Sequence, residues 1–283
     1  MFVPAVDTAP IDWVARWRAA VEARHDQGRR LDSQHHRADA WAGRAQRFNR
    51  YVAETGAGDP LLGMLLRAVD ANTTVLDVGA GPGRHTVPLA KVARHVTAVE
   101  PSAAMRELLE ENVRAADLTN VDVVDASWPD VHVRPADVVV CSHVLYGTVE
   151  VEPFVRALDA ATRRACYVAL RIGQREGAYL PLFEAVWGEP RALAPTALDL
   201  FNVVHQLGLP ANFTTIPFQP WRDYESLDAA VEQVRADVLN PTDPAAEATI
   251  RAWLQSNLTE RDGRLSLLGD APRAGVVWWE KGP

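Results

Sequence analysis

The sequence predicts an α/β protein with a mostly parallel sheet and helices on both of its faces. From residue 74 onward, short apolar runs rich in β-branched residues alternate with stretches of helical periodicity. The apolar runs are continuous, which is typical of strands that are buried on both faces of a parallel sheet. A chain of 283 residues with 48% hydrophobic and 23% charged residues can bury such a core.

The first 58 residues are predicted to form a helical cap that precedes any strand. Apolar residues recur at helical spacing over 11–25 and again over 36–54. The segment TGAGDP ends the second of these helices, and Pro60 begins a third. We therefore expect an N-terminal helical cap, 1–58, followed by a main domain, 59–283.

The main domain is predicted to alternate strand and helix up to residue 172. The expected strands are 74–78, 95–99, 121–124, 136–141 and 166–172, and the helices between them lie near 84–93, 102–116 and 151–164.

The segment 173–211 breaks this alternation with two helix-like stretches, and it is too long for an ordinary connection. We expect a helical insertion there, placed as a lid over the open end of the sheet. A strand over 212–218, helices over 227–239 and 245–258, and a last strand over 274–279 are predicted to follow.

Charge and cysteine usage exclude several classes of partner. The net charge of −8 argues against nucleic acid. Cys141 and Cys166 lie in apolar runs and are expected to be buried free thiols, so no oxidising compartment is needed. No run reaches transmembrane length and the start is not a signal peptide, so we expect a cytoplasmic protein without a membrane partner. No Cys/His spacing or acidic cluster suggests a metal, and the oligomeric state stays open.

The segment VLDVGAGPGRHTVPLA, 75–90, places three glycines between a strand and a helix. Gly79, Gly81 and Gly83 would let the backbone approach a ligand at the helix N-terminus, whereas the other reading is a turn with incidental glycines. A triphosphate loop needs Gly-Lys-Ser/Thr, which is absent, and a dinucleotide fingerprint needs glycine where Arg84 stands. The loop therefore suits an adenosine-containing ligand with no phosphate to cradle.

Acidic residues end the next two strands. Glu100 closes the second strand, where an acid can accept both ribose hydroxyls of an adenosine, although an exposed loop acid is the alternative. In VVDASWPD, Asp125 stands where a carboxylate can meet an adenine amino group or cap a helix. Trp128 stands where its ring can stack on the adenine.

Taken together, four segments resemble the motifs of class I S-adenosylmethionine-dependent methyltransferases. These are VLDVGAGPGRHTVPLA, VTAVEPSAAM, VVDASWPD and ADVVVCSHVLYG, in the order of the first to fourth motif of that family. The resemblance covers about residues 60–172. It implies a seven-stranded sheet of order 3-2-1-4-5-7-6 with the last strand antiparallel. Residues 59–283 would then form a Rossmann-like domain that binds S-adenosylmethionine.

The resemblance also implies a set of cofactor-binding residues at the carboxyl ends of the strands and in the N-terminal cap. The set is Arg44, Asp77, Gly79, Ala80, Gly81, Gly83, Glu100, Pro101, Asp125, Ala126, Trp128, Ser142 and His143.

Within this set, each part of the cofactor has an expected partner. The methionine amino group would lie near Asp77 and Gly79, the ribose on Glu100, and the adenine at Asp125 with Ala126. Arg44 belongs to ADAWAGRAQRFNRY, which resembles an opening helix common in the family, and either Arg44 or Tyr51 would reach the methionine carboxylate. The sulfonium would lie beside the Ser-His pair that follows the fourth strand.

His143 and Tyr146 are the candidate catalytic residues. Methyl transfer from a sulfonium is an in-line displacement, and a base is needed only when the acceptor must lose a proton. His143 follows the fourth strand at the crevice and is the candidate base, although this position in the family often only lines the cofactor pocket. Tyr146 would orient the acceptor. His85 and His205 are interpreted as packing residues.

The acceptor is expected to be a small or medium-sized, partly apolar molecule. The fourth motif reads CSHV and not Asn/Asp-Pro-Pro-Tyr, which argues against methylation of amino groups in DNA bases or glutamine. In the insertion, four apolar residues would line a pocket or simply pack the inserted helices: Phe183, Trp187, Leu200 and Phe201. A non-catalytic S-adenosylmethionine-binding or partner protein is the alternative, and a dinucleotide-dependent oxidoreductase is disfavoured.

Overall fold

The computed structural model describes residues 10–32, 41, 44–174, 177–217, 223–261, 263–267 and 273–282. Its main sheet has seven strands in the order β3-β2-β1-β4-β5-β10-β6. These are β1 (Thr74–Val78), β2 (His95–Val99), β3 (Val121–Val124), β4 (Ala136–Ser142), β5 (Thr162–Arg171), β6 (Asn212–Pro217) and β10 (Arg273–Glu280). β10 runs antiparallel to both β5 and β6. The predicted fold class and strand order are confirmed, with β10 as the inserted last strand.

The register of the central strands separates two apolar layers, one on each face of the sheet. Leu76 and Val78 of β1 pack in a core shared with α6 (Val151–Ala160) and α8 (Ala197–Gln206). Val75 points to the opposite face, where it packs with α3 (Pro60–Ala68) and α4 (Thr86–Ala90). Because side chains alternate along a strand, an uninterrupted apolar run supplies both layers.

Two more helices position the site at the carboxyl end of the sheet. α5 (Ala103–Ala115) follows β2, and α2 (Ala45–Thr55) packs on α5 through Ala45, Met105 and Leu108. Short 3₁₀ segments lie at Gly56–Gly58, Leu145–Gly147 and Gly177–Tyr179. Among the described residues, no helix combines the length and the hydropathy needed to cross a membrane.

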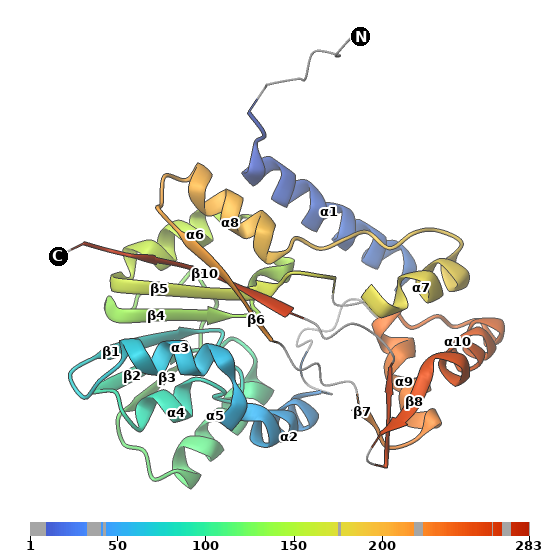
Figure 1. The fold of residues 1–283 in the computed structure, drawn as a ribbon, viewed down its shortest axis with the longest axis horizontal. Helices are drawn as coiled ribbons and strands as arrows, with labels where there is room; N and C mark the ends of the chain where they lie inside the picture. The colour runs from blue at the N-terminus through green and yellow to red at the C-terminus, as the bar shows by residue number, and fades with distance from the viewer. Residues whose placement is uncertain are drawn as a thin grey trace.

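A second body, here called the small lobe, was not predicted as a unit. It comprises α7 (Leu180–Trp187), α9 (Leu227–Asp237), α10 (Pro244–Asn257) and a three-stranded sheet of order β7-β9-β8. The strands are β7 (Asp223–Tyr224), β8 (Leu258–Arg261) and β9 (Arg264–Leu267). Figure 1 shows these elements together at the right of the view, apart from the main sheet. The three strands are too short for a period of two to be detected from the sequence.

The first helix, α1 (Trp13–Leu31), connects the core of the main sheet with the small lobe (Figure 1). Trp17 is buried in the main core, whereas Leu31 packs against the small-lobe core. The sequence predicted an end near residue 25, because the polar segment that follows breaks the apolar periodicity. The helix continues because Gln27 is buried and exchanges hydrogen bonds with the segment 189–192. Of the predicted helix over 36–54, residues 36–40, 42 and 43 lie outside the described residues, as do 1–9 of the expected cap.

Two glycine substitutions should change stability in opposite directions. A Cβ on Gly275 of β10 would lie 2.5 Å from the Ala197 Cβ and 2.7 Å from the Phe213 ring, so Gly275→Ala should destabilise by about 1–3 kcal/mol through overpacking. Gly63 lies within α3, and a Cβ at that position would have no other atom within 4 Å, so Gly63→Ala should stabilise by up to about 1 kcal/mol. Urea unfolding of both variants measures this, and equal midpoints would contradict it.

Candidate functional site

The glycine loop, residues 79–83, is shaped by close approach and by positive φ angles. Its glycines have φ of 71°, 56° and 96° at Gly79, Gly81 and Gly83, a region that favours glycine. A Cβ on Gly79 would lie 2.3 Å from Val144 Cγ2, so the loop runs directly against the segment that follows β4. A Cβ on Gly81 would lie 3.8 Å from Phe48 Cε1, so the loop faces the ring of Phe48 on α2 there.

The backbone amides of the glycine loop are bonded within the protein. The N–H groups of Gly79 and Ala80 donate to the Val99 carbonyl, at 2.8 and 3.1 Å. Gly81 N donates to Glu100 Oε2 at 2.8 Å, and Gly83 N to the Ala80 carbonyl at 3.1 Å. Pro82 has no N–H. A phosphate cradle needs several amides that point outward, and this loop uses its amides internally.

Glu100 is buried at the tip of β2. Its two carboxylate oxygens accept hydrogen bonds from Gly81 N at 2.8 Å and Ser102 N at 2.9 Å. Burial raises the pKa of Glu100 against the effect of these two hydrogen bonds, and the nearby Asp77 carboxyl raises it further. Each oxygen has a second lone pair, so the carboxylate has the acceptor capacity that a pair of ribose hydroxyls would use.

Asp77 lies in β1, two residues before the glycine loop, and is buried. Thr86 Oγ1 donates to Asp77 Oδ2 at 2.7 Å. Burial raises the pKa of Asp77, and the charge of His85 and the Thr86 hydrogen bonds oppose that rise. The structure therefore ties this strand-end acid to the first turn of α4.

Asp125 lies at the tip of β3 and is paired with a residue that the sequence reasoning missed. Arg106 Nη2 donates to Asp125 Oδ2 at 2.7 Å, and the Asp125 side chain is 70% exposed. Arg106 Nη1 also donates to the carbonyls of Glu100 at 3.0 Å and Pro101 at 2.8 Å. One guanidinium thus joins the tips of β2 and β3. An arginine in the first turns of a surface helix carries no sequence signal for this role.

Ala126 and Trp128 lie against the main core, next to α6. Both are partly buried there, and Trp128 Nε1 donates to the Phe154 carbonyl at 3.3 Å. The indole N–H of Trp128 thus has its hydrogen-bond partner in α6, which packs in the main core. Adenine stacking by Trp128 stays a prediction.

His143 and Tyr146 are brought together directly after β4. Ser142 ends that strand opposite Ala169 of β5, and His143 N donates to the Ala169 carbonyl at 2.8 Å. His143 Nδ1 lies 2.7 Å from the Tyr146 hydroxyl, which accepts from Arg171 N at 2.8 Å. Burial and the charge of Arg171 lower the pKa of His143 well below its usual value, so the imidazole is neutral at pH 7.

The backbone at His143 is unusual and marks this position. Its φ is 62°, in the left-handed region that costs a histidine free energy. Such a conformation persists only where surrounding contacts over-determine it, and it is frequent at functional sites. Arg171, with its Cζ 5.6 Å from the Tyr146 ring centroid, is a further neighbour that the sequence reasoning did not single out.

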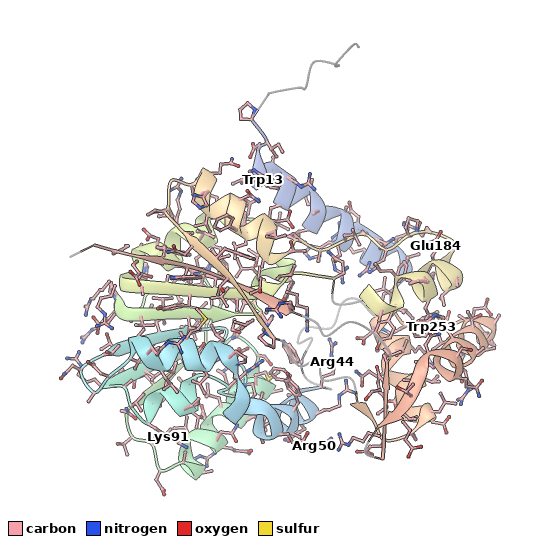
Figure 2. The ribbon with its side chains drawn as sticks, viewed as in Figure 1. Trp13, Arg44, Arg50, Lys91, Glu184 and Trp253 are labelled. Atoms are coloured by element: carbon pink, nitrogen blue, oxygen red, sulfur yellow. The ribbon has the colours of Figure 1, made fainter. Side chains whose placement is uncertain are left out.

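Arg44 immediately precedes α2. Its Cζ lies 5.6 Å from the Trp41 ring centroid, and Figure 2 shows Arg44 between the main sheet and the small lobe. Further along α2, Tyr51 lies 6.0 Å from the Arg84 Cζ. The predicted opening helix thus lies against the glycine loop, while the contact of Arg44 with a methionine carboxylate stays a prediction.

Of the two alternatives for the apolar residues of the insertion, a shared pocket or simple packing, the structure supports packing, because the four residues lie at two different cores. Phe183 is buried in the small-lobe core, and Trp187 packs against it. Leu200 is buried in the main core, and Phe201 packs against that core. The two helices of the insertion therefore pack on different cores, α7 on that of the small lobe and α8 on that of the main sheet.

Two other histidines have structural partners, as expected. His205 Nε2 lies 3.1 Å from the Ala211 carbonyl, and His85 is buried beside Asp59. In the part of the chain that the structure describes, no three or more His, Cys, Asp or Glu side chains are grouped so as to hold a metal ion.

Comparisons with known proteins agree with this geometry. Residues 75–165 match the model of a family described as a methyltransferase domain. An uncharacterized protein of Haemophilus influenzae is 30% identical over 176 residues, which cover 59% of this chain and 65% of that protein, less than two thirds of its length.

Two solved structures share the fold at low sequence identity. Magnesium protoporphyrin IX methyltransferase from Synechocystis, with bound SAH, is 13% identical with a TM-score of 0.50, covering 96% of this chain and 100% of that chain. Coclaurine N-methyltransferase, bound to N-methylheliamine and SAH, is 13% identical with a TM-score of 0.53, covering 96% and 89%. Residues 75–165 thus match a methyltransferase domain, and the strand order of the sheet is the one that the resemblance to class I S-adenosylmethionine-dependent methyltransferases implies.

Proposed function

We propose that this protein transfers the methyl group of S-adenosylmethionine to a small or medium-sized, partly apolar acceptor by in-line displacement. The observation that carries the proposal is the arrangement of Glu100 and the glycine loop within a methyltransferase domain. S-adenosylmethionine supplies a methyl group already activated on a sulfonium, so the protein contributes chiefly positioning and desolvation.

The residues on the donor side fit an adenosine without phosphates. The loop uses its amides internally and offers no cradle, while Glu100 is a buried acceptor for hydroxyl groups. In this proposal Asp77 and Gly79 bind the methionine amino group, Asp125 and Ala126 the adenine, and Arg44 the methionine carboxylate. The Arg106 contact sets the orientation of Asp125 for that role.

The residues on the acceptor side are His143 and Tyr146, at the carboxyl end of β4. A neutral imidazole is able to take a proton from an acceptor group, and the Tyr146 hydroxyl holds the ring in place. Small-molecule acceptors agree with the N-methylheliamine bound to coclaurine N-methyltransferase, and the net charge of −8 disfavours nucleic acid. Incubation with methyl-labelled S-adenosylmethionine and cell extracts, followed by a search for the labelled product, tests this proposal.

The alternative is a non-catalytic S-adenosylmethionine-binding or partner protein. Such a protein would bind S-adenosylmethionine with the same residues as the proposed enzyme, but it would not transfer the methyl group. Calorimetric binding of S-adenosylhomocysteine without transfer to any acceptor in a broad panel would favour it. Binding of NAD in place of S-adenosylhomocysteine would instead favour a dinucleotide-dependent oxidoreductase.

Replacing Glu100 should weaken donor binding. Glu100→Ala is expected to reduce the affinity for S-adenosylhomocysteine by about 1–3 kcal/mol, because hydroxyl groups would lose a buried partner. Asp122→Ala is the control, since Asp122 lies on neighbouring β3 with a 73% exposed side chain that pairs with His95. Titration calorimetry measures both variants. Equal affinity of Glu100→Ala and wild type would place the ribose elsewhere.

The affinity for S-adenosylhomocysteine should fall in mild acid. The pKa of Glu100 is raised. On acidification its carboxylate therefore becomes protonated at a higher pH than that of an ordinary glutamate, whose pKa is about 4.3. Affinity is therefore complete above the raised pKa and declines as the pH falls through it. Folding stability has the opposite trend for this group, because the folded state takes up the proton first. Calorimetry from about pH 7 down to about the ordinary glutamate pKa measures the decline. Glu100→Gln should flatten it, and an unchanged slope in that variant contradicts the assignment.

Replacing His143 should lower transfer more than donor binding. Asn tolerates the left-handed backbone of this position, so His143→Asn should keep the fold. We expect transfer of labelled methyl to fall by about 100-fold, as for loss of a general base. The fall should exceed any loss of affinity for S-adenosylhomocysteine. Transfer at the wild-type rate would remove His143 from catalysis.

A further inference from the structure

Asp59 lies behind the glycine loop, and its two carboxylate oxygens make different contacts. Oδ1 accepts from Leu61 N at 2.9 Å and caps the N-terminus of α3. Oδ2 accepts from Arg84 Nε at 2.8 Å and lies 3.0 Å from His85 Nε2. The first contact belongs to the helix, whereas the second holds two residues that directly follow the glycine loop.

These Oδ2 contacts are enclosed and charged. The side chains of Asp59 and His85 are 3% and 4% exposed, and that of Arg84 is 15% exposed. Burial opposes ionisation of Asp59, but the hydrogen bond from His85 and the charges of His85 and Arg84 outweigh it. They hold the pKa of Asp59 well below its usual range. Charge-assisted hydrogen bonds in such a place are strong, and removing one partner alone is costly.

The contacts of Asp59 belong to a group of hydrogen bonds that hold the glycine loop at its start, in its middle and directly after its end. At the start, the Val99 carbonyl accepts from Gly79 and Ala80. In the middle, Asn112 Nδ2 donates to the Pro82 carbonyl at 2.8 Å. After the loop, Arg84 and His85 bond to Asp59, and the next residue, Thr86, bonds to Asp77.

Arg84 extends the connection to α2. Its Cζ lies 6.0 Å from the Tyr51 ring centroid, at a distance suited to a cation–π contact. Asp59, Arg84 and Tyr51 therefore link the start of α3, the end of the glycine loop and the helix that lies against that loop. This contact also accounts for an arginine at the position where a dinucleotide-binding loop has glycine.

We propose that Asp59 is a positioning residue for donor binding, which anchors Arg84 and His85 and so holds the glycine loop in its ligand-receiving conformation. The proposal rests on the proposed function, because it takes S-adenosylmethionine as the ligand of the loop. Asp59 itself does not touch that ligand. It acts through the loop, since a pre-organised loop does not lose conformational freedom when the ligand binds.

Asp59→Asn separates the two contacts of this residue. Asparagine is an equally good N-cap, so Oδ1 keeps its bond to Leu61 N. The amide NH₂ that replaces Oδ2 meets the N–H donors of Arg84 and His85 and cannot accept from them. Asp243→Asn is the matched control. Asp243 caps α10 through Ala245 N at 2.9 Å and is followed by Pro244, as Asp59 is followed by Pro60.

Two measurements test the proposal, with S-adenosylhomocysteine as the probe. By calorimetry, Asp59→Asn should bind about tenfold or more weakly through loss of pre-organisation, and Asp243→Asn should bind as wild type does. By hydrogen–deuterium exchange, the peptide over 79–86 should exchange faster in Asp59→Asn while α3 stays protected. A residue with only a capping role would not produce this difference.

Equal affinity in the two variants overturns the proposal, and so does faster exchange in α3 together with the loop. If Asp59→Asn does not fold, Arg84→Gln takes its place, because it leaves the Asp59 cap of α3 intact. Arg84→Gln should also bind S-adenosylhomocysteine more weakly than wild type does. Wild-type affinity in Arg84→Gln would overturn the proposal. If the wild-type protein does not bind S-adenosylhomocysteine, the proposed function fails. Loop exchange then still decides the anchoring itself, because unchanged exchange over 79–86 contradicts it.

Discussion

The site depends on one pair of hydrogen bonds, from the N–H groups of Gly79 and Ala80 to the carbonyl of Val99. Val99 ends β2, and Gly79 follows the last residue of β1, so this pair turns the chain at the edge where the parallel strands end. The turn brings the Gly81 amide to Glu100. A Cβ on Gly79 would collide with Val144, so the turn also sets how closely the segment after β4 can approach. The same bend thus positions both Glu100 and the segment that follows β4.

Three buried carboxyl groups surround this bend, and each has a different role because its partners differ. Asp59 receives charged donors, which keep its pKa low. Asp77 and Glu100 have mainly neutral donors, and burial raises their pKa values. Asp59 is therefore a permanent anion suited to anchoring, whereas Glu100 is an acceptor whose charge responds to its surroundings. These differences arise from elements that are far apart in the sequence.

The small lobe and the main sheet are connected by contacts that belong to neither core alone. α1 has one end in each core, and Asn240 Nδ2 donates to Asp32 Oδ2 at 3.2 Å just beyond that helix. On the side of the site, Arg47 Nη1 of α2 donates to Gln233 Oε1 of α9 at 2.5 Å. The helix that lies against the glycine loop is therefore also held by the small lobe. A change in the position of the small lobe would therefore reach the glycine loop through α2.

The positions of the central strands, the glycine loop and the position of Glu100 could be predicted from local patterns in the amino-acid sequence, whereas the order of the strands followed only from the resemblance to a known family. Continuous apolar runs and a glycine-rich strand-to-helix turn are local patterns, and they depend on few distant contacts. The folded chain was needed to show that Arg106 joins two strand tips, that the Arg171 N–H donates to the Tyr146 hydroxyl, and that Asp59 accepts a hydrogen bond from Arg84. It was also needed to show that the inserted helices divide between two cores. An isolated Arg or Asp looks the same in a sequence whether it is solvated or paired, because its partner is chosen by packing between distant segments.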